Sequence, residues 1–284
     1  MGRESFWTSD PAELLRARPG FRLDEQDTGG KPGFDGSKGQ GKSALREGAA
    51  IVAELQERLF AAGTVGEKRS VLLVLQAMDT AGKGGIVAHV VGAMKPDGVH
   101  YAGFKKPTPA ELAHDFLWRI ERELPAAGQV GVFDRSHYED VLIGRVRNLA
   151  PASEIERRYG AINDFERIVA GGGTTIVKVM LHLSKEEQKT RLMRRLHRRD
   201  KYWKYNPGDV DERELWDLYQ DAYQIVFDRT STDVAPWYVI PADRKWYARL
   251  AVQHLLINAL EGLDLDWPEP EYDVEEERRR LAAT

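Results

Sequence analysis

Short, uninterrupted apolar runs alternate with longer amphipathic segments along most of this chain. Runs of this length and composition are typical of strands buried on both faces of a sheet, and they lie at 71–75, 100–104, 129–133, 174–183 and 237–240. Apolar side chains at helical spacing predict helices between them, over 43–62, 85–94, 109–124 and 210–227. Strands that alternate with helices predict an α/β fold, with a parallel sheet covered by helices on both faces.

The apolar run at 71–75 leads directly into a glycine-rich turn at 77–85, Ala-Met-Asp-Thr-Ala-Gly-Lys-Gly-Gly. A glycine turn between a strand and a helix can aim backbone N–H groups at one phosphate, and a lysine adds a positive charge. The segment is therefore predicted to be a phosphate-binding loop, whose phosphate-binding residues are Thr80, Ala81, Gly82, Lys83, Gly84 and Gly85.

This loop departs twice from the usual phosphate-loop pattern. Ala77 stands at the first glycine position, and Gly84 stands where a magnesium-binding hydroxyl is expected. Another group must then hold the metal. Asp79 is the candidate, because a carboxylate among phosphate-binding amides would repel phosphate unless a cation or a proton separated them.

A second charged turn, at 134–140, follows the strand expected at 129–133. Ligands of open α/β sheets bind beyond the carboxyl ends of the strands, so Asp134 and Asp79 can share one ligand. Asp134 is predicted to hold the metal, and Arg135 to neutralise a phosphoryl oxygen during transfer. We expect His137 to pack or to form hydrogen bonds, because phosphoryl transfer to a phosphate needs no deprotonation near neutral pH.

The segment 185–204 carries nine basic residues and three acidic ones. A charge run is often a solvated helix face, but this one connects to a phosphate-loop domain and ends in a turn, which is the form of a lid. Trp203 and Tyr205 are expected to anchor that turn. The chain is thus divided into an irregular arm over 1–42, an α/β domain over 43–262 with a lid at about 184–228, and a charged tail over 263–284, which the sequence leaves open as a helix, a subunit contact or a disordered segment.

Composition narrows the class of protein. The chain has 284 residues, no cysteine and a net charge of −4, which excludes disulfides and thiolate chemistry and argues against a nucleic-acid-coating surface. No stretch approaches the roughly 20 apolar residues of a membrane span, and the N-terminus lacks the apolar core of a signal peptide. We therefore expect a cytoplasmic protein with no membrane and no nucleic-acid partner.

Four segments, at 77–85, 104–108, 133–140 and 201–207, resemble the signature segments of the polyphosphate kinase 2 family, in the same order. The resemblance covers about 45–260 and implies a thymidylate-kinase-like P-loop fold with a helical lid. It also implies reversible, magnesium-dependent phosphoryl transfer between inorganic polyphosphate and nucleotides, with Mn²⁺ as an alternative ion. Homodimers or homotetramers are implied as well.

The resemblance assigns roles to matched residues. Asp79 and Asp134 would hold the metal, and together with Lys83 and Arg135 they would form the catalytic set. The polyphosphate chain would contact Arg194, Arg195, Arg198, Arg199, Lys201 and Lys204. The nucleotide, with AMP and ADP as the expected acceptors, would contact Lys105, Lys106, Pro107, Thr108, Tyr138 and Glu139.

Two other functions remain open at this point. One is an ATP-dependent kinase of a small metabolite, which would use the basic lid for ATP. The other is a non-catalytic protein that binds polyphosphate or RNA on a kinase scaffold.

Overall fold

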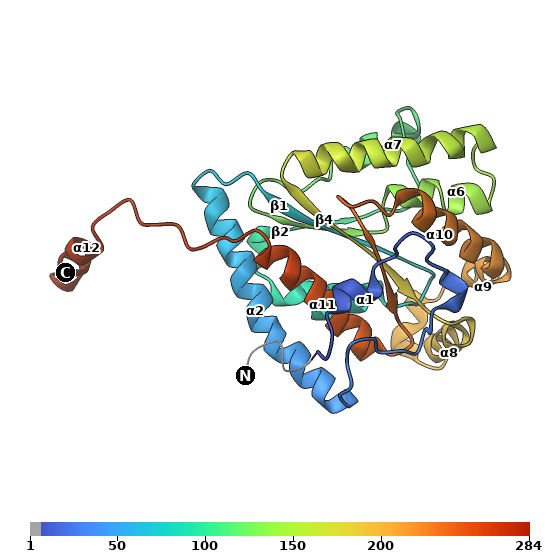
Figure 1. The fold of residues 1–284 in the computed structure, drawn as a ribbon, viewed down its shortest axis with the longest axis horizontal. Helices are drawn as coiled ribbons and strands as arrows, with labels where there is room; N and C mark the ends of the chain where they lie inside the picture. The colour runs from blue at the N-terminus through green and yellow to red at the C-terminus, as the bar shows by residue number, and fades with distance from the viewer. Residues whose placement is uncertain (1–6) are drawn as a thin grey trace.

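The computed structural model describes residues 7–284. Within them, five parallel strands form one sheet in the order β2-β3-β1-β4-β5 (Figure 1). The strands are β1 Ser70–Ala77, β2 Val99–Gly103, β3 Val130–Asp134, β4 Thr174–His182 and β5 Trp237–Pro241. The predicted parallel sheet is therefore confirmed, with strand ends shifted by at most two residues.

Helices cover both faces of the sheet. The longer ones are α2 Lys38–Thr64, α7 Ala152–Gly171, α8 Lys185–Leu196, α10 Trp216–Thr230 and α11 Lys245–Glu261. The shorter ones are α1 Pro11–Leu15, α3 Lys83–His89, α4 Pro109–Leu112, α5 Trp118–Glu121, α6 Ile143–Val146, α9 Gly208–Glu214 and α12 Val274–Ala282. Figure 1 shows α2 and α11 on one face of the sheet and α7 and α10 on the other.

The alternation of side chains along β1 builds two cores. Val71, Leu73 and Leu75 pack in the core that includes α2 and α11, whereas Leu72 and Val74 pack in the core that includes α7 and α10. All five side chains are at most 2% exposed. Five consecutive apolar side chains, from Val71 to Leu75, are what a central strand with two covered faces requires.

Helix α2 begins five residues before the expected start at position 43. Ser37 caps it: its hydroxyl accepts a hydrogen bond from the Gln40 N–H, and the Gln40 side chain accepts one from the Ser37 N–H. This capping box stabilises the first turn even though the segment is rich in glycine. The expectation of an irregular chain up to residue 42 is wrong for residues 38–42.

The prediction of one helix over 109–124 is also wrong in extent, because this segment forms two short helices, α4 and α5. Thr108 caps α4, since its hydroxyl accepts a hydrogen bond from the Glu111 N–H and the Glu111 carboxylate accepts one from the Thr108 N–H. Asp115 then accepts a hydrogen bond from the Leu117 N–H, a local turn that competes with a continuous helix. The helix expected over 210–227 is likewise two helices, α9 and α10, which meet at Leu215.

The described part of the arm, from Trp7 onward, wraps around the domain. Leu15, Leu23 and Phe34 are buried, and Ala17 N–H donates to Trp237 O of β5 at 2.8 Å. The tail leads away from the domain and ends in the exposed helix α12 (Figure 1). None of the helices formed by residues 7–284 is both long enough and apolar enough to cross a membrane.

Candidate active site

The phosphate loop, residues 77–85, joins β1 to α3 through two residues with positive φ. Thr80 has φ +68° and Gly82 has φ +126°, a value that favours glycine. Helix α3 begins at Lys83, directly after Gly82. The first N–H groups of a helix generally have no partner within it, so the start of α3 can offer backbone donors beside the lysine. The Gly85 N–H, however, already donates to Gly82 O at 2.8 Å.

Asp79 and Asp134 are each paired with a cation. Strands β1 and β3 are neighbours, with Leu75 in register with Asp134, so the two acidic turns meet at one edge of the sheet. An Arg135 Nη2 lies 3.3 Å from Asp79 Oδ1, and Lys83 Nζ lies 3.8 Å from Asp134 Oδ1. The predicted catalytic set of Asp79, Lys83, Asp134 and Arg135 is therefore brought together.

Further carboxylates surround Asp79. The pKa of Glu139 is raised, mainly because the side chain is buried. The negative charge of Asp79 also raises this pKa, whereas the positive charges of Arg135 and Lys83 lower it. Burial and the charge of Asp79 also raise the pKa of Asp209 on α9, although Arg195 lies 3.3 Å away. Carboxylates that repel one another in this way favour the binding of a cation among them.

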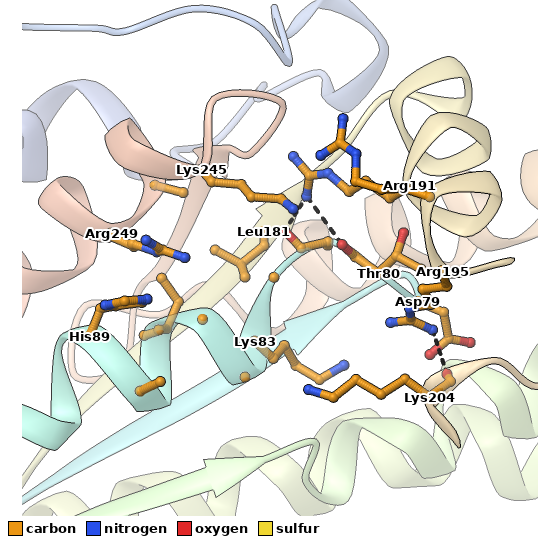
Figure 2. A pocket seen from close by; sticks show the side chains of 18 of the residues that line it. Asp79, Thr80, Lys83, His89, Leu181, Arg191, Arg195, Lys204, Lys245 and Arg249 are labelled. Carbon is orange, nitrogen blue, oxygen red and sulfur yellow. Dashed lines mark hydrogen bonds between the residues drawn. The ribbon is translucent and has the colours of Figure 1, made fainter. Parts of the chain in front are cut away.

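The lid helix α8 is tied to the phosphate loop by Arg191. Its guanidinium, 4% exposed, donates to Thr80 O at 3.1 Å and Ala81 O at 2.7 Å, as Figure 2 shows, and to Ala242 O at 2.6 Å. Gln188 of the same helix donates to Asp79 O at 3.1 Å. These bonds fix the base of the lid against the loop and the end of β5.

A pocket of about 560 Å³ opens over the phosphate loop, and we call it the loop pocket. Nine lysines and arginines line it, against the two aspartates Asp79 and Asp134. Figure 2 shows Lys83 of α3 and Lys204 after α8 reaching into it from the two sides. The predicted residues that line it are Asp79, Thr80, Ala81, Gly82, Lys83, Gly84, Gly85, Asp134, Arg194, Arg195, Arg198, Lys201 and Lys204.

The remaining predicted residues lie outside the loop pocket. Arg135 lies beside it, 3.3 Å from Asp79 Oδ1 and 4.0 Å from Glu139 Oε2, and neither Glu139 nor Arg199 is among its lining residues. The predicted nucleotide segment follows β2 beside the second acidic turn, since the Phe104 N–H donates to Asp134 O at 3.0 Å and Arg119 donates to Lys105 O at 2.8 Å. Its other members are Lys106, Pro107 and Thr108.

The prediction that Tyr138 contacts a nucleotide is wrong. Its side chain is fully buried, and its hydroxyl donates to Glu166 Oε1 at 2.7 Å and accepts from Lys178 Nζ at 2.8 Å. The structural interpretation of His137 is confirmed, because the ring is 1% exposed and lies 3.3 Å from Glu166 Oε1. Trp203 holds its turn by an indole hydrogen bond to Asp200 O rather than by burial, since it is 78% exposed.

Sequence reasoning missed three cations of the pocket. Arg191 was counted in the basic run but not assigned a contact, and Lys245 and Arg249 lie at the start of α11, far away in the chain. A Cβ on Gly85 would lie 3.2 Å from an Arg249 terminal nitrogen, so this arginine covers the phosphate loop. The phosphate loop itself gives no signal of which helix packs beside it.

Comparisons with known proteins agree with this geometry. The family model of Polyphosphate kinase 2 matches residues 36–267. An AMP/ADP-polyphosphate phosphotransferase of Meiothermus ruber is 46% identical over 88% of this chain and 91% of its own length. An ADP-polyphosphate phosphotransferase of Rhodopseudomonas palustris is 40% identical over 83% of this chain and 84% of its own length.

The crystal structure of polyphosphate kinase 2 from Arthrobacter aurescens TC1 superposes with a TM-score of 0.96 at 57% identity, over 98% of both chains. The expected family and the expected α/β kinase fold are therefore confirmed. This chain belongs to the polyphosphate kinase 2 family, whose enzymes transfer phosphoryl groups between polyphosphate and nucleotides.

Proposed function

We propose that this phosphotransferase holds the end of a polyphosphate chain in the loop pocket and exchanges a phosphoryl group with AMP or ADP. The observation that carries the proposal is the excess of nine cations over two carboxylates around one phosphate loop. A polymer with about one charge per phosphate needs such a lining, whereas a single nucleotide phosphate group needs less of it. The relatives named for AMP and ADP support the choice of acceptor.

The acceptor nucleotide is proposed to lie beside the segment 104–108, with its terminal phosphate near Asp134. An oxygen of that phosphate forms a bond to the terminal phosphorus of the chain, and the bond from this phosphorus to the next bridging oxygen breaks. The oxygen that attacks is already deprotonated near neutral pH, so no side chain has to remove a proton. Lys83 and Arg135 are proposed to neutralise the oxygens of the phosphoryl group during transfer.

Asp79 and Asp134 are proposed to hold Mg²⁺. The donor set fits: Mg²⁺ is commonly bound by one or two carboxylates together with substrate phosphates, and among residues 7–284 no larger group of metal-binding side chains gathers. The buried Thr80 hydroxyl, which has no hydrogen-bond partner within the described residues, also leaves a place for a ligand oxygen. The ion would supply positive charge that offsets the negative charge of the reacting phosphates. Mn²⁺ is proposed as a substitute, and assembly into a homodimer or homotetramer stays a prediction.

Asp79→Asn and Asp134→Asn test the assignment. Each removes one charged metal ligand, so we expect turnover to fall by about a thousandfold, the scale of losing a principal electrostatic group. Both aspartate side chains are partly exposed, at 33% and 26%, so the variants should keep their fold. The measurement is formation of ATP from ADP, Mg²⁺ and polyphosphate, with unfolding followed in parallel.

Asp97→Asn, an exposed aspartate outside the loop pocket, is the matched control and should retain full activity. Near-normal turnover in both site variants would contradict the proposal that Asp79 and Asp134 hold the metal ion. Wild-type protein that binds polyphosphate but makes no ATP would favour the non-catalytic alternative, and phosphorylation of a small metabolite by ATP alone would favour the other kinase. Parallel assays with AMP and ADP decide the acceptor.

A further inference from the structure

A second basic hollow adjoins the loop pocket. It has a volume of about 590 Å³, and we call it the arm pocket because the wrapped arm and the start of α2 form one side of it. The arm and α2 contribute Lys31, Lys38 and Lys42. Arg194, Lys245 and Arg249 line both pockets, so the two hollows are joined along the first turns of α11 and the lid helix α8.

The positive charge of the arm pocket is not balanced within it. Two carboxylates, Glu187 and Asp243, line it together with seven lysines and arginines. Both are already engaged: Glu187 accepts from Arg191 Nε at 2.8 Å, and Asp243 accepts from the Ser184 N–H at 2.9 Å and the Thr28 hydroxyl at 2.8 Å. The pocket therefore presents a surplus of cations to any anion that enters it.

The shared cations repel one another. Partial burial lowers the pKa of Lys245, and the charges of Arg191 and Arg194 lower it further. Burial lowers the pKa of Arg249 as well. Crowded cations with lowered pKa values gain free energy when an anion binds between them, because the anion supplies the missing counter-charge.

Lys38 and Lys42 extend this positive surface away from the phosphate loop. They are four residues apart on α2, so they project from neighbouring turns on the same side of the helix, and both are exposed. Lys38 and Lys42 do not line the loop pocket, so a ligand confined to that pocket would not use them. A linear phosphate polymer that begins at the loop can continue through the shared cations into the arm pocket.

We propose that the arm pocket is a distal binding site for the same polyphosphate chain, in which Lys38 and Lys42 contact phosphates far from the reacting one. The proposal rests on polyphosphate binding in the loop pocket, as proposed above. It makes the enzyme sensitive to chain length, because a short chain fills the loop pocket alone while a long chain gains contacts in both. The arm and the first turns of α2 then belong to substrate recognition as well as to the fold.

The test compares the double variant Lys38→Gln/Lys42→Gln with wild type, using tripolyphosphate and long-chain polyphosphate as donors to ADP. Two lost contacts between exposed charges should raise KM for the long chain by about 3- to 10-fold. The KM for tripolyphosphate should change less than about twofold, since a short chain held by the loop pocket does not need Lys38 and Lys42, which line only the arm pocket, and salt screens exposed charges. Lys68→Gln/Lys95→Gln removes the same charge from exposed positions outside both pockets and should change neither KM.

A binding assay that needs no turnover accompanies the kinetics. Affinity for fluorescently labelled long-chain polyphosphate is measured over a range of salt concentrations. Losing two phosphate contacts should reduce the slope of log affinity against log salt by about 1.4, at roughly 0.7 for each contact with a single-stranded polyanion. Equal effects on short and long chains, or an unchanged long-chain KM and salt slope, would overturn the distal site.

If the proposed function itself is wrong, the experiments give a different result from the one that overturns the distal site. Wild-type protein would then make no ATP with a donor of either length. The salt slopes of wild type and the double variant would still decide whether the arm pocket binds the polymer.

Discussion

At the scale of single residues, His182 shows how burial beside the site sets a pH dependence. It ends β4, is 6% exposed, and burial lowers its pKa from the usual 6.5 to about 4. Between these values the unfolded chain binds a proton that the folded protein does not, so stability falls as the pH falls from 6.5 towards 4. This single group should cost about 2 kcal/mol of unfolding free energy between pH 7 and pH 5.

His182→Leu removes the proton site and should reduce that loss by about 2 kcal/mol. Urea unfolding at pH 7 and pH 5 measures it, and His197→Leu, which alters an exposed histidine, is the control. If wild type and His182→Leu lose stability equally on acidification, buried His182 is not the cause.

Residue by residue, the sequence predicted which candidate catalytic side chains lie together better than it predicted their surroundings. Asp79, Lys83, Asp134 and Arg135 follow strands whose carboxyl ends must meet at one sheet edge, so a local pattern was enough. Arg249 reaches the phosphate loop only because α11 packs beside it, a contact across more than 160 positions with no local signal. Tyr138 was misplaced for a related reason, because its burial depends on Glu166 and Lys178 from two other elements.

At the scale of elements, the early start of α2 depends on close packing against α11. A Cβ on Gly41 would overlap the Trp246 indole, so this glycine allows the two helices to approach. The sequence contains the capping signal, a serine followed three residues later by a glutamine. The three glycines among positions 36–41, however, have low helix propensity and argue against a helix there. Tertiary packing decided the boundary, which periodicity alone could not do.

Gly41→Ala should therefore destabilise the protein by about 1–3 kcal/mol, the usual cost of overpacking. Gly39→Ala is the matched control in the same turn. A Cβ there meets nothing closer than Ser37 Oγ at 3.7 Å, so the variant should gain about 0.5–1 kcal/mol from helix propensity. Urea unfolding of both variants checks the pair, and a Gly41→Ala variant as stable as wild type would contradict the close approach of α2 and α11.

At the scale of the whole molecule, positive charge is concentrated at one site of a protein whose net charge is negative. The chain carries a net charge of −4, yet the loop pocket gathers nine lysines and arginines around two aspartates. Cations held together in the absence of an anion destabilise the folded state, and a polyanion that binds only the folded protein restores that free energy. The sequence predicted a concentration of basic residues in the lid, but the lid supplies only six of the nine cations, the phosphate loop supplies Lys83, and the start of α11 supplies the other two.

Lys245 makes this trade-off measurable, because burial and the charges of neighbouring arginines lower its pKa and it lines both pockets. Lys245→Met keeps a side chain of similar length without the charge, so the free protein should melt about 0.5–1 °C higher, the shift that a few tenths of a kcal/mol produces in a chain of this size. The same variant should show a smaller rise in Tm when long-chain polyphosphate is added, because one cation of the continuous positive surface is gone. Lys68→Met, exposed and outside both pockets, should leave both melting temperatures near those of wild type. A Lys245→Met variant that is less stable alone, yet gains as much as wild type from polyphosphate, would mean that Lys245 supports the fold rather than the binding of the polymer.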